Sequence, residues 1–223
     1  MRRLRDRLVR RPRLLFVGIN PSLRSAEVGH HFAGPGNPFW RLLHASGLVP
    51  APMTYADDVR LPALGLALTN IVARPTRSAD ELTPAEYAAG ARRLRRLVAR
   101  IEPDVVAFVG VTVYARVFGG RGRPGGGPKP ERIGAARVFV VPNPSGRNAA
   151  YPGFADKLRW YRRLARYAGR GGRPPAPPRA IAWQAPGTAA MIGARRPAPR
   201  RGRRGAAPST RAAGGPVVAR GSG

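Results

Sequence analysis

The feature that most constrains the fold of this chain is a regular alternation of short apolar runs and amphipathic segments along its first 168 residues. The apolar runs are predicted to be buried strands, and they occupy residues 14–18, 66–72, 105–110 and 138–141. The amphipathic segments follow a helical period at residues 39–46, 84–101, 111–118 and 154–167. This alternation predicts an α/β fold with three layers, in which a central, mainly parallel, short β-sheet is flanked by helices.

The clearest helix signal is that of residues 84–101. Thr83 has the side chain of an N-cap, Glu86 stands at the capping-box position three residues later, and Pro103 follows the last turn. In a parallel sheet, ligands bind beyond the carboxyl ends of the strands. A site is therefore expected in the loops that follow the four predicted strands.

Composition divides the chain into three parts. Residues 1–12 are predicted to be a basic N-terminal extension, residues 13–168 a single domain, and residues 169–223 a disordered tail. The tail is rich in Arg, Pro, Gly and Ala, contains eleven arginines and no acidic residue, and lacks the apolar surface needed to order itself. It is either a tether for a polyanion or a passive extension.

The excess of positive charge favours a nucleic-acid partner. The chain has 40 Lys and Arg residues against 11 Asp and Glu residues, which gives a formal net charge of +29. A field of this sign attracts polyanions and makes their binding dependent on salt. A GC-rich genome would explain why only Lys129 and Lys157 are lysines, but not why cations so outnumber anions.

Several classes of protein are excluded by what the sequence lacks. There is no cysteine, which excludes disulfides, iron–sulfur clusters and thiolate zinc sites, and the three histidines match no zinc motif. We therefore expect neither a metal nor a cofactor. No apolar run approaches the roughly 20 residues of a membrane span, so we expect a cytoplasmic protein and no membrane partner. We also expect a monomer, associated with the nucleoid of a bacterial cell.

Unusual polar and aromatic residues gather in the loops that follow the predicted strands. Asn20 comes after the first strand, and Pro21 restricts Asn20 to an extended or turn conformation. Residues 29–40 then concentrate imidazole and aromatic rings among glycines and prolines, a composition that suits stacking on a nucleobase. Asn70 stands near the end of the second strand, and a proline-rich turn at residues 142–148 follows the last.

Together, and in this order, these segments resemble the mismatch-specific thymine/uracil-DNA glycosylase family of the uracil-DNA glycosylase superfamily. The resemblance covers about residues 13–168 and rests on Gly-Ile-Asn-Pro at 18–21, Gly-His-His-Phe at 29–32, Gly-Pro-Gly-Asn at 34–37, Phe39-Trp40, Thr69-Asn70, Pro-Asn-Pro-Ser-Gly-Arg at 142–147, Tyr151-Pro152 and Asp156-Lys157. It implies a monofunctional DNA repair enzyme that flips a mispaired uracil, or thymine, out of double-stranded DNA and hydrolyses its N-glycosidic bond.

The resemblance also implies roles for the residues that follow the first strand. Asn20 would position the attacking water, Phe32 would stack on the flipped base, and Ile19 and His31 would help to line the base pocket. An asparagine is a poor proton acceptor, so Asn20 would orient the water without acting as a strong base, and slow turnover is expected.

Further roles are implied at the other strand ends. Asn70 and Asn143 would lie at the edge of the base, Ser145 and Gly146 would grip the DNA backbone, and Arg147 would fill the gap that the flipped nucleotide leaves in the duplex.

Two serines bear on the range of substrates. Ser22 replaces the glycine that is usual in the family's first motif, which would narrow the approach of the backbone to the base. Ser25 falls where the resemblance places a residue near the pyrimidine C5 position, so its hydroxyl would hinder the methyl group of thymine.

Other functions remain open from the sequence alone. The most efficient uracil-specific family has Asp and His where this chain has Asn20 and Asn143, and the iron–sulfur families need cysteine. A catalytically silent protein could use the same pocket to recognise mismatched or damaged DNA. A nucleotide-binding or small-molecule enzyme of the same layered fold would need phosphate-loop or metal residues that the sequence lacks.

Overall fold

The sheet is five-stranded, with the order β2-β1-β3-β5-β4. We describe it from a computed structural model, in which residues 4–118, 125–145 and 150–169 are described. Strands β1 (Leu14–Gly18), β2 (Leu66–Asn70), β3 (Val105–Val109) and β5 (Ala136–Val141) run parallel, and β4 (Gly127–Ile133) runs antiparallel to β5 at one edge. The prediction of a mainly parallel sheet is confirmed.

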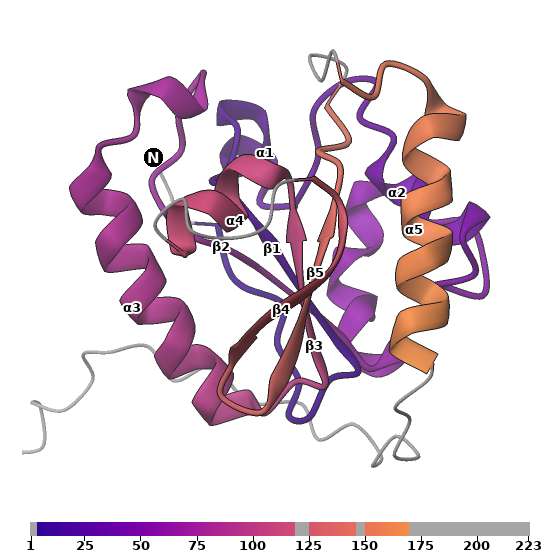
Figure 1. Cartoon of the computed structure of the whole chain (residues 1–223). Helices are drawn as coiled ribbons and strands as arrows, with labels where there is room; N and C mark the ends of the chain where they lie inside the picture. The colour runs from indigo at the N-terminus through magenta and orange to yellow at the C-terminus, as the bar shows by residue number, and fades with distance from the viewer. Residues whose placement is uncertain (1–3, 119–124, 146–149, 170–223) are drawn as a thin grey trace, which may run out of the picture. The chain divides into compact units, whose positions relative to one another are not determined.

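Helices cover both faces of this sheet (Figure 1). Leu15 and Val17 of β1 pack into the core beneath α3 (Pro84–Ile101) and α4 (Val111–Val117). Leu14 and Phe16 point the other way, into the core beneath α2 (Phe39–Ala45) and α5 (Phe154–Gly169). Successive side chains of a strand alternate between faces, so a strand covered on both sides has to be apolar throughout. This explains the uninterrupted apolar runs and confirms the three layers.

Helix α3 has the bounds that its sequence predicts. The Thr83 hydroxyl accepts a hydrogen bond from the backbone N–H of Glu86 at 3.2 Å, and the Glu86 carboxylate accepts one from the backbone N–H of Thr83 at 2.9 Å. These two bonds form the predicted capping box. They satisfy two backbone donors that the first turn of a helix otherwise leaves without partners.

Four short elements were not predicted: α1 (Leu23–Val28), the 3-10 helices η1 (Tyr55–Leu64) and η2 (Ala79–Glu81), and β4. Strand β4 contains Pro128 and Pro130, and proline occurs in sheets mainly on edge strands because it cannot donate a ladder hydrogen bond. Residues 119–124, which precede this strand in the sequence, lie outside the described part.

The described part of the predicted N-terminal extension packs against the sheet. The backbone N–H of Arg7 donates to the carbonyl of Leu68 at 2.9 Å, and the N–H of Leu68 donates back to Arg7 at 2.7 Å. Val9 is buried. The segment around Arg7 therefore lies beside β2. The tail, beyond residue 169, lies outside the described residues.

Candidate functional site

A cleft of about 430 Å³ opens where the carboxyl ends of β1, β2, β3 and β5 meet. Its volume falls in the range of small-ligand sites. Strands β2 and β3 flank β1 on opposite sides, so the cleft lies at the switch point where open α/β sheets bind ligands. Every predicted site residue that the structure describes lines it: Ile19, Asn20, Ser25, His31, Phe32, Asn70, Asn143 and Ser145.

The side chain of Asn20 is held by the loop that follows β2. Its amide nitrogen donates to the carbonyl of Arg74 at 3.0 Å and to the hydroxyl of Thr76 at 2.7 Å. The Thr76 hydroxyl in turn donates to the carbonyl of Ser78 at 2.6 Å. Both protons of the Asn20 amide are thereby engaged. The part of the amide that remains to face a ligand is the oxygen, which can only accept a hydrogen bond.

The backbone of this loop is fixed as well. The N–H groups of Ile71 and Val72 donate to the carbonyls of Gly18 and Ile19 at 2.8 and 2.9 Å. The N–H of Thr76 donates to the carbonyl of Pro21 at 3.2 Å. The segments beyond β1 and β2 thus stay paired past the last ladder residues, which holds Asn20 in a rigid position.

Close packing around Gly18 brings Asn70 to the cleft. A Cβ at Gly18 would lie 2.5 Å from the side-chain oxygen of Asn70 and 3.5 Å from the Cζ of Phe32. Any side chain larger than hydrogen would displace Asn70, which is only 8% exposed. Gly18 is therefore required for the approach of Asn70, and not for a special backbone angle.

Phe32 stands in the cleft with one side of its ring already occupied. It stacks on Phe39 with ring centroids 3.9 Å apart and an interplanar angle of 19°. Its φ of 51° lies in the left-handed region, which is unfavourable for an aromatic residue. The packing of the loop holds it there. A ligand that stacks on Phe32 has to use the opposite face of the ring.

A buried carboxylate, Asp58, holds the loop before Phe32. It is fully buried on η1, where it accepts hydrogen bonds from Arg7 Nε and from the backbone N–H of His31, each at 2.9 Å. The Nδ1 of His30 also lies 2.9 Å from Asp58, and Arg7 bonds the carbonyl of Gly29 at 2.9 Å. Asp58 thus joins η1 and the N-terminal segment to the loop between α1 and α2, residues 29–38, which we call the pocket loop.

His31 is buried and neutral. Its Nε2 lies 3.0 Å from the carbonyl of Arg5, which can only accept, so Nε2 carries the proton. Desolvation lowers the pKa of His31 from 6.5 to about 4, against the smaller raising effects of the Arg5 hydrogen bond and of Asp58. At neutral pH the imidazole therefore adds no charge to the cleft and is not a general acid.

Ser22 and Ser25 form the start of α1. The Ser22 hydroxyl accepts from the N–H of Ser25 at 3.1 Å, as an N-cap. The Ser25 hydroxyl accepts from the N–H of Ala33 and from the Ser22 hydroxyl, each at 3.1 Å. Ser25 is only 2% exposed. Because the Ser25 oxygen accepts a hydrogen bond from the pocket loop, Ser25 stabilises that loop as well as lining the cleft.

The turn after β5 completes the wall. The side-chain oxygen of Asn143 accepts from the N–H of Ser145 at 2.9 Å, which folds the residues 143–145 back on themselves. Asn143 also packs over Gly110, at 3.5 Å from where a Cβ would stand. The predicted DNA-contact residues Gly146 and Arg147 lie outside the described residues.

Sequence reasoning missed the residues that hold this site in place, namely Asp58, Arg7 and Thr76. No local motif marks Asp58, and Arg7 lies in a segment predicted to be an extension. Thr76 stands in a loop to which the sequence analysis gave no role.

The fold and the cleft define a class of protein: a three-layer α/β protein with a cleft at the carboxyl edge of its sheet, lined mainly by amides, hydroxyls and apolar side chains. In the described ranges no group of three His, Asp or Glu residues could hold a metal ion. Nor does any helix among those residues have the length and apolar character to cross a membrane.

Comparison with known proteins identifies the family. Residues 7–165 match the model of the uracil DNA glycosylase superfamily. A G/U mismatch-specific uracil DNA glycosylase of Schizosaccharomyces pombe (strain 972 / ATCC 24843) is 35% identical over 181 residues, which cover 73% of this chain and 56% of that protein. The chain therefore belongs to the uracil DNA glycosylase superfamily, and it spans little more than half the length of this relative.

A solved structure agrees on the fold. The solution NMR structure of a Methanosarcina acetivorans protein assigned to the uracil DNA glycosylases has a TM-score of 0.52 and 19% sequence identity, and the match covers 74% of this chain and 98% of that chain. The sequence-based recognition of the superfamily is confirmed by the family model and the Schizosaccharomyces relative.

Proposed function

We propose that this protein excises uracil mispaired with guanine: it extrudes the uracil nucleotide from double-stranded DNA and hydrolyses its N-glycosidic bond, leaving an abasic site. The observation that carries the proposal is the fixed amide of Asn20. With both N–H bonds held by Arg74 and Thr76, its oxygen is presented as an acceptor for a water molecule. Positioning a water against the sugar carbon removes much of the entropic part of the barrier.

The rest of the cleft supports a reaction without a strong general acid. His31 is neutral at physiological pH because its pKa is about 4. The departing uracil can be stabilised as an anion by fixed hydrogen-bond donors, because a preorganised polar site costs no reorganisation during the reaction. The amides of Asn70 and Asn143 are donors of the kind that a pyrimidine edge requires.

The extrusion step accounts for a preference for mispaired bases. A base leaves the stack at a cost of a few kcal/mol, and the cost is least for a mismatched pair. Phe32, supported from behind by Phe39, offers an aromatic face on which the extruded base can stack. The high positive charge of the chain would favour binding to the duplex. The relative from Schizosaccharomyces pombe is named for the same G/U mismatch.

A direct assay tests the proposal. The full chain is incubated with end-labelled duplexes that contain a single G·U, A·U or G·T pair, and alkali then cleaves the strand at any abasic site. We expect cleavage at uracil, fastest opposite guanine. Binding of the mismatch without cleavage in any duplex would overturn the enzymatic proposal and favour a catalytically silent lesion-binding protein.

A further inference from the structure

We propose that Arg77 forms a binding subsite for a backbone phosphate of the substrate strand, placed on the ridge between the cleft and a neighbouring hollow. The inference rests on the proposed function, because it takes DNA as the ligand. It concerns a residue outside every motif that the resemblance to the family contains.

The ridge lies between two cavities of similar size. A second hollow, also of about 430 Å³, adjoins the cleft on the side of α4 and Tyr151. The residues that line both cavities are Ile19, Arg77, Ser78, Ala79, Asn143 and Ser145. Arg77 is exposed. A DNA strand whose base enters the cleft has to pass its sugar and phosphates over the edge of the cleft. The ridge is the edge that the two cavities share.

Arg77 also differs in charge from the other described residues that line the two cavities. Among the described residues that line either cavity, it is the only one with a permanently charged side chain. The other lining groups are amides, hydroxyls, apolar side chains and the neutral His31. A guanidinium is the side chain best matched to a phosphate, since it can donate two parallel hydrogen bonds.

The neighbouring arginine shows what a structural role would look like. Arg74 makes a bidentate contact with the carboxylate of Glu86 at 2.7 and 3.0 Å and bonds the carbonyl of Glu81 at 2.8 Å. No ion pair in the described part of the chain involves the guanidinium of Arg77. Among its contacts with described residues, only the backbone N–H of Arg77 is engaged, by the Glu81 carboxylate at 3.0 Å.

The acidic side chains of this loop are bound elsewhere. Glu81 accepts from the N–H groups of Arg77 and Ser78 at 3.0 and 2.9 Å. Asp80 accepts from the Ser78 hydroxyl at 2.9 Å. Glu86 is held by Arg74 and by its capping box. The loop thus satisfies its own carboxylates without the Arg77 side chain.

The position of Arg77 links phosphate binding to the chemical step. Arg77 follows Thr76, whose hydroxyl holds the amide of Asn20 at 2.7 Å. A phosphate bound at Arg77 would be anchored to the same rigid loop that fixes the water-positioning residue. Binding at this subsite therefore places the substrate strand at a set position relative to Asn20.

The test pairs a protein variant with neutral DNA linkages. Binding of a G·U duplex is measured with 2′-fluorinated deoxyuridine, since the electron-withdrawing fluorine slows cleavage of the glycosidic bond. Methylphosphonates, which lack the phosphate charge, replace the linkages around the uridine one at a time. Arg77→Ala is compared with Arg92→Ala, a matched control on the exposed face of α3.

For Arg77→Ala we expect a loss of affinity of about 10-fold, as for one charge-assisted contact, and a decrease of about one in the slope of log K against log salt. One methylphosphonate position should produce the same loss in the wild type and no further loss in Arg77→Ala. Losses that add at every position, or an Arg77→Ala affinity equal to that of Arg92→Ala, would overturn the subsite.

Failure of the subsite is distinguishable from failure of the proposed function. The binding measurements do not depend on excision, and cleavage of an unmodified G·U duplex by the wild type is assayed separately. A wild type that fails to cleave, but whose affinity loss from one methylphosphonate disappears in Arg77→Ala, would retain the phosphate subsite and refute the glycosylase proposal. A wild type that cleaves, but in which the losses from Arg77→Ala and from every methylphosphonate add, would retain the glycosylase proposal and refute the subsite.

Discussion

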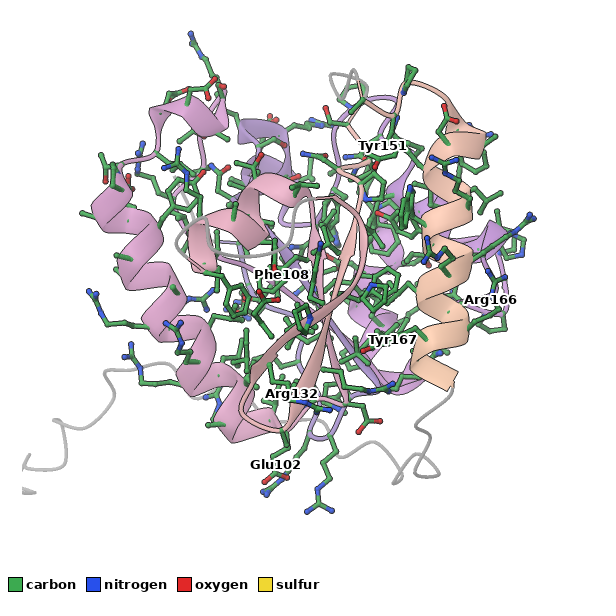
Figure 2. The ribbon with its side chains drawn as sticks, in the orientation of Figure 1. Glu102, Phe108, Arg132, Tyr151, Arg166 and Tyr167 are labelled. Carbon is green, nitrogen blue, oxygen red and sulfur yellow. The ribbon has the colours of Figure 1, made fainter. Side chains whose placement is uncertain are left out.

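Two hollows of nearly equal volume lie at opposite ends of the same sheet. The cleft at the carboxyl end measures about 430 Å³, and a hollow of about 420 Å³ lies at the amino end, between the end of α3 and the turn that joins β4 to β5. In Figure 2, Glu102 and Arg132 mark the amino end and Tyr151 lies toward the opposite end. Volume alone therefore does not identify the functional site.

The two hollows differ in what their polar groups do. The amino-end hollow is lined by the charged residues Glu102, Asp104, Arg132 and Arg137. Glu102 bonds Arg11 at 3.0 Å, which lowers the pKa of Glu102, and Arg137 bonds the carbonyl of Tyr167 at 3.1 Å and lies over its ring. These groups fasten elements together. At the carboxyl end, hydrogen bonds instead aim neutral amides into the open space.

The largest effect is expected from Asn20→Ala. Loss of the oriented amide should slow single-turnover excision of uracil opposite guanine by at least about 1,000-fold, because water positioning and a preorganised acceptor are lost together. Affinity for the mismatched duplex should change little. Arg132→Ala, in the amino-end hollow, is the control and should leave the rate unchanged. Near-normal excision by Asn20→Ala would remove the amide from the mechanism.

Acid should destabilise the protein through the carboxyl-end cleft. Burial lowers the pKa of His31 from 6.5 to about 4, so the unfolded chain gains a proton as the pH falls through 6.5 while the folded chain resists until about 4. The contribution of neutral His31 to the free energy of unfolding is thus fully present above pH 6.5 and is lost as the pH falls toward 4. The total loss is about 3 kcal/mol. Urea unfolding across this range measures it. His31→Gln should show a smaller pH dependence, and an unchanged dependence would assign the titration to other groups.

A glycine in each hollow gives a matched pair of variants. Gly18→Ala should reduce excision by about 30-fold, because its Cβ displaces the Asn70 side chain and a small misplacement of a site residue is costly to the rate. Gly134→Ala has open space around its Cβ but a φ of 60°. It should cost about 1 kcal/mol of stability with no change in rate. A rate loss in Gly18→Ala no larger than that in Gly134→Ala would show that the packing of Gly18 against Asn70 does not affect excision.

The smallest effect concerns Ser25. Because its hydroxyl accepts from Ala33 and Ser22, we expect Ser25→Ala to loosen the pocket loop and to slow G·U and G·T excision alike, by about threefold, the loss of one modest hydrogen bond. Single-turnover rates on both duplexes decide the matter. A selective gain on G·T would instead show that the hydroxyl crowds the thymine methyl, as the resemblance to the family implies.

Local signals were sufficient for the elements that bury apolar side chains in a regular period. The bounds of β1 and α3 agree with the prediction because an apolar run and a capping box are properties of neighbouring residues. The prediction extended β2 to Val72, but the strand ends at Asn70. Ile71 and Val72 are buried in the core on the α3 side, and an apolar composition does not tell such a loop from a strand.

The sequence by itself determined the layered fold, the strand ends at which the site lies and the presence of Asn20 there. Only the tertiary structure decided what holds these residues. Asp58 meets the N–H of His31 across 27 residues and Arg7 across 51, and Thr76 meets Asn20 across 56. The physical reason is that such partners are chosen by strand order and by the packing of loops. A local pattern specifies a helix or a strand, but it contains no information on which distant segment will lie beside it.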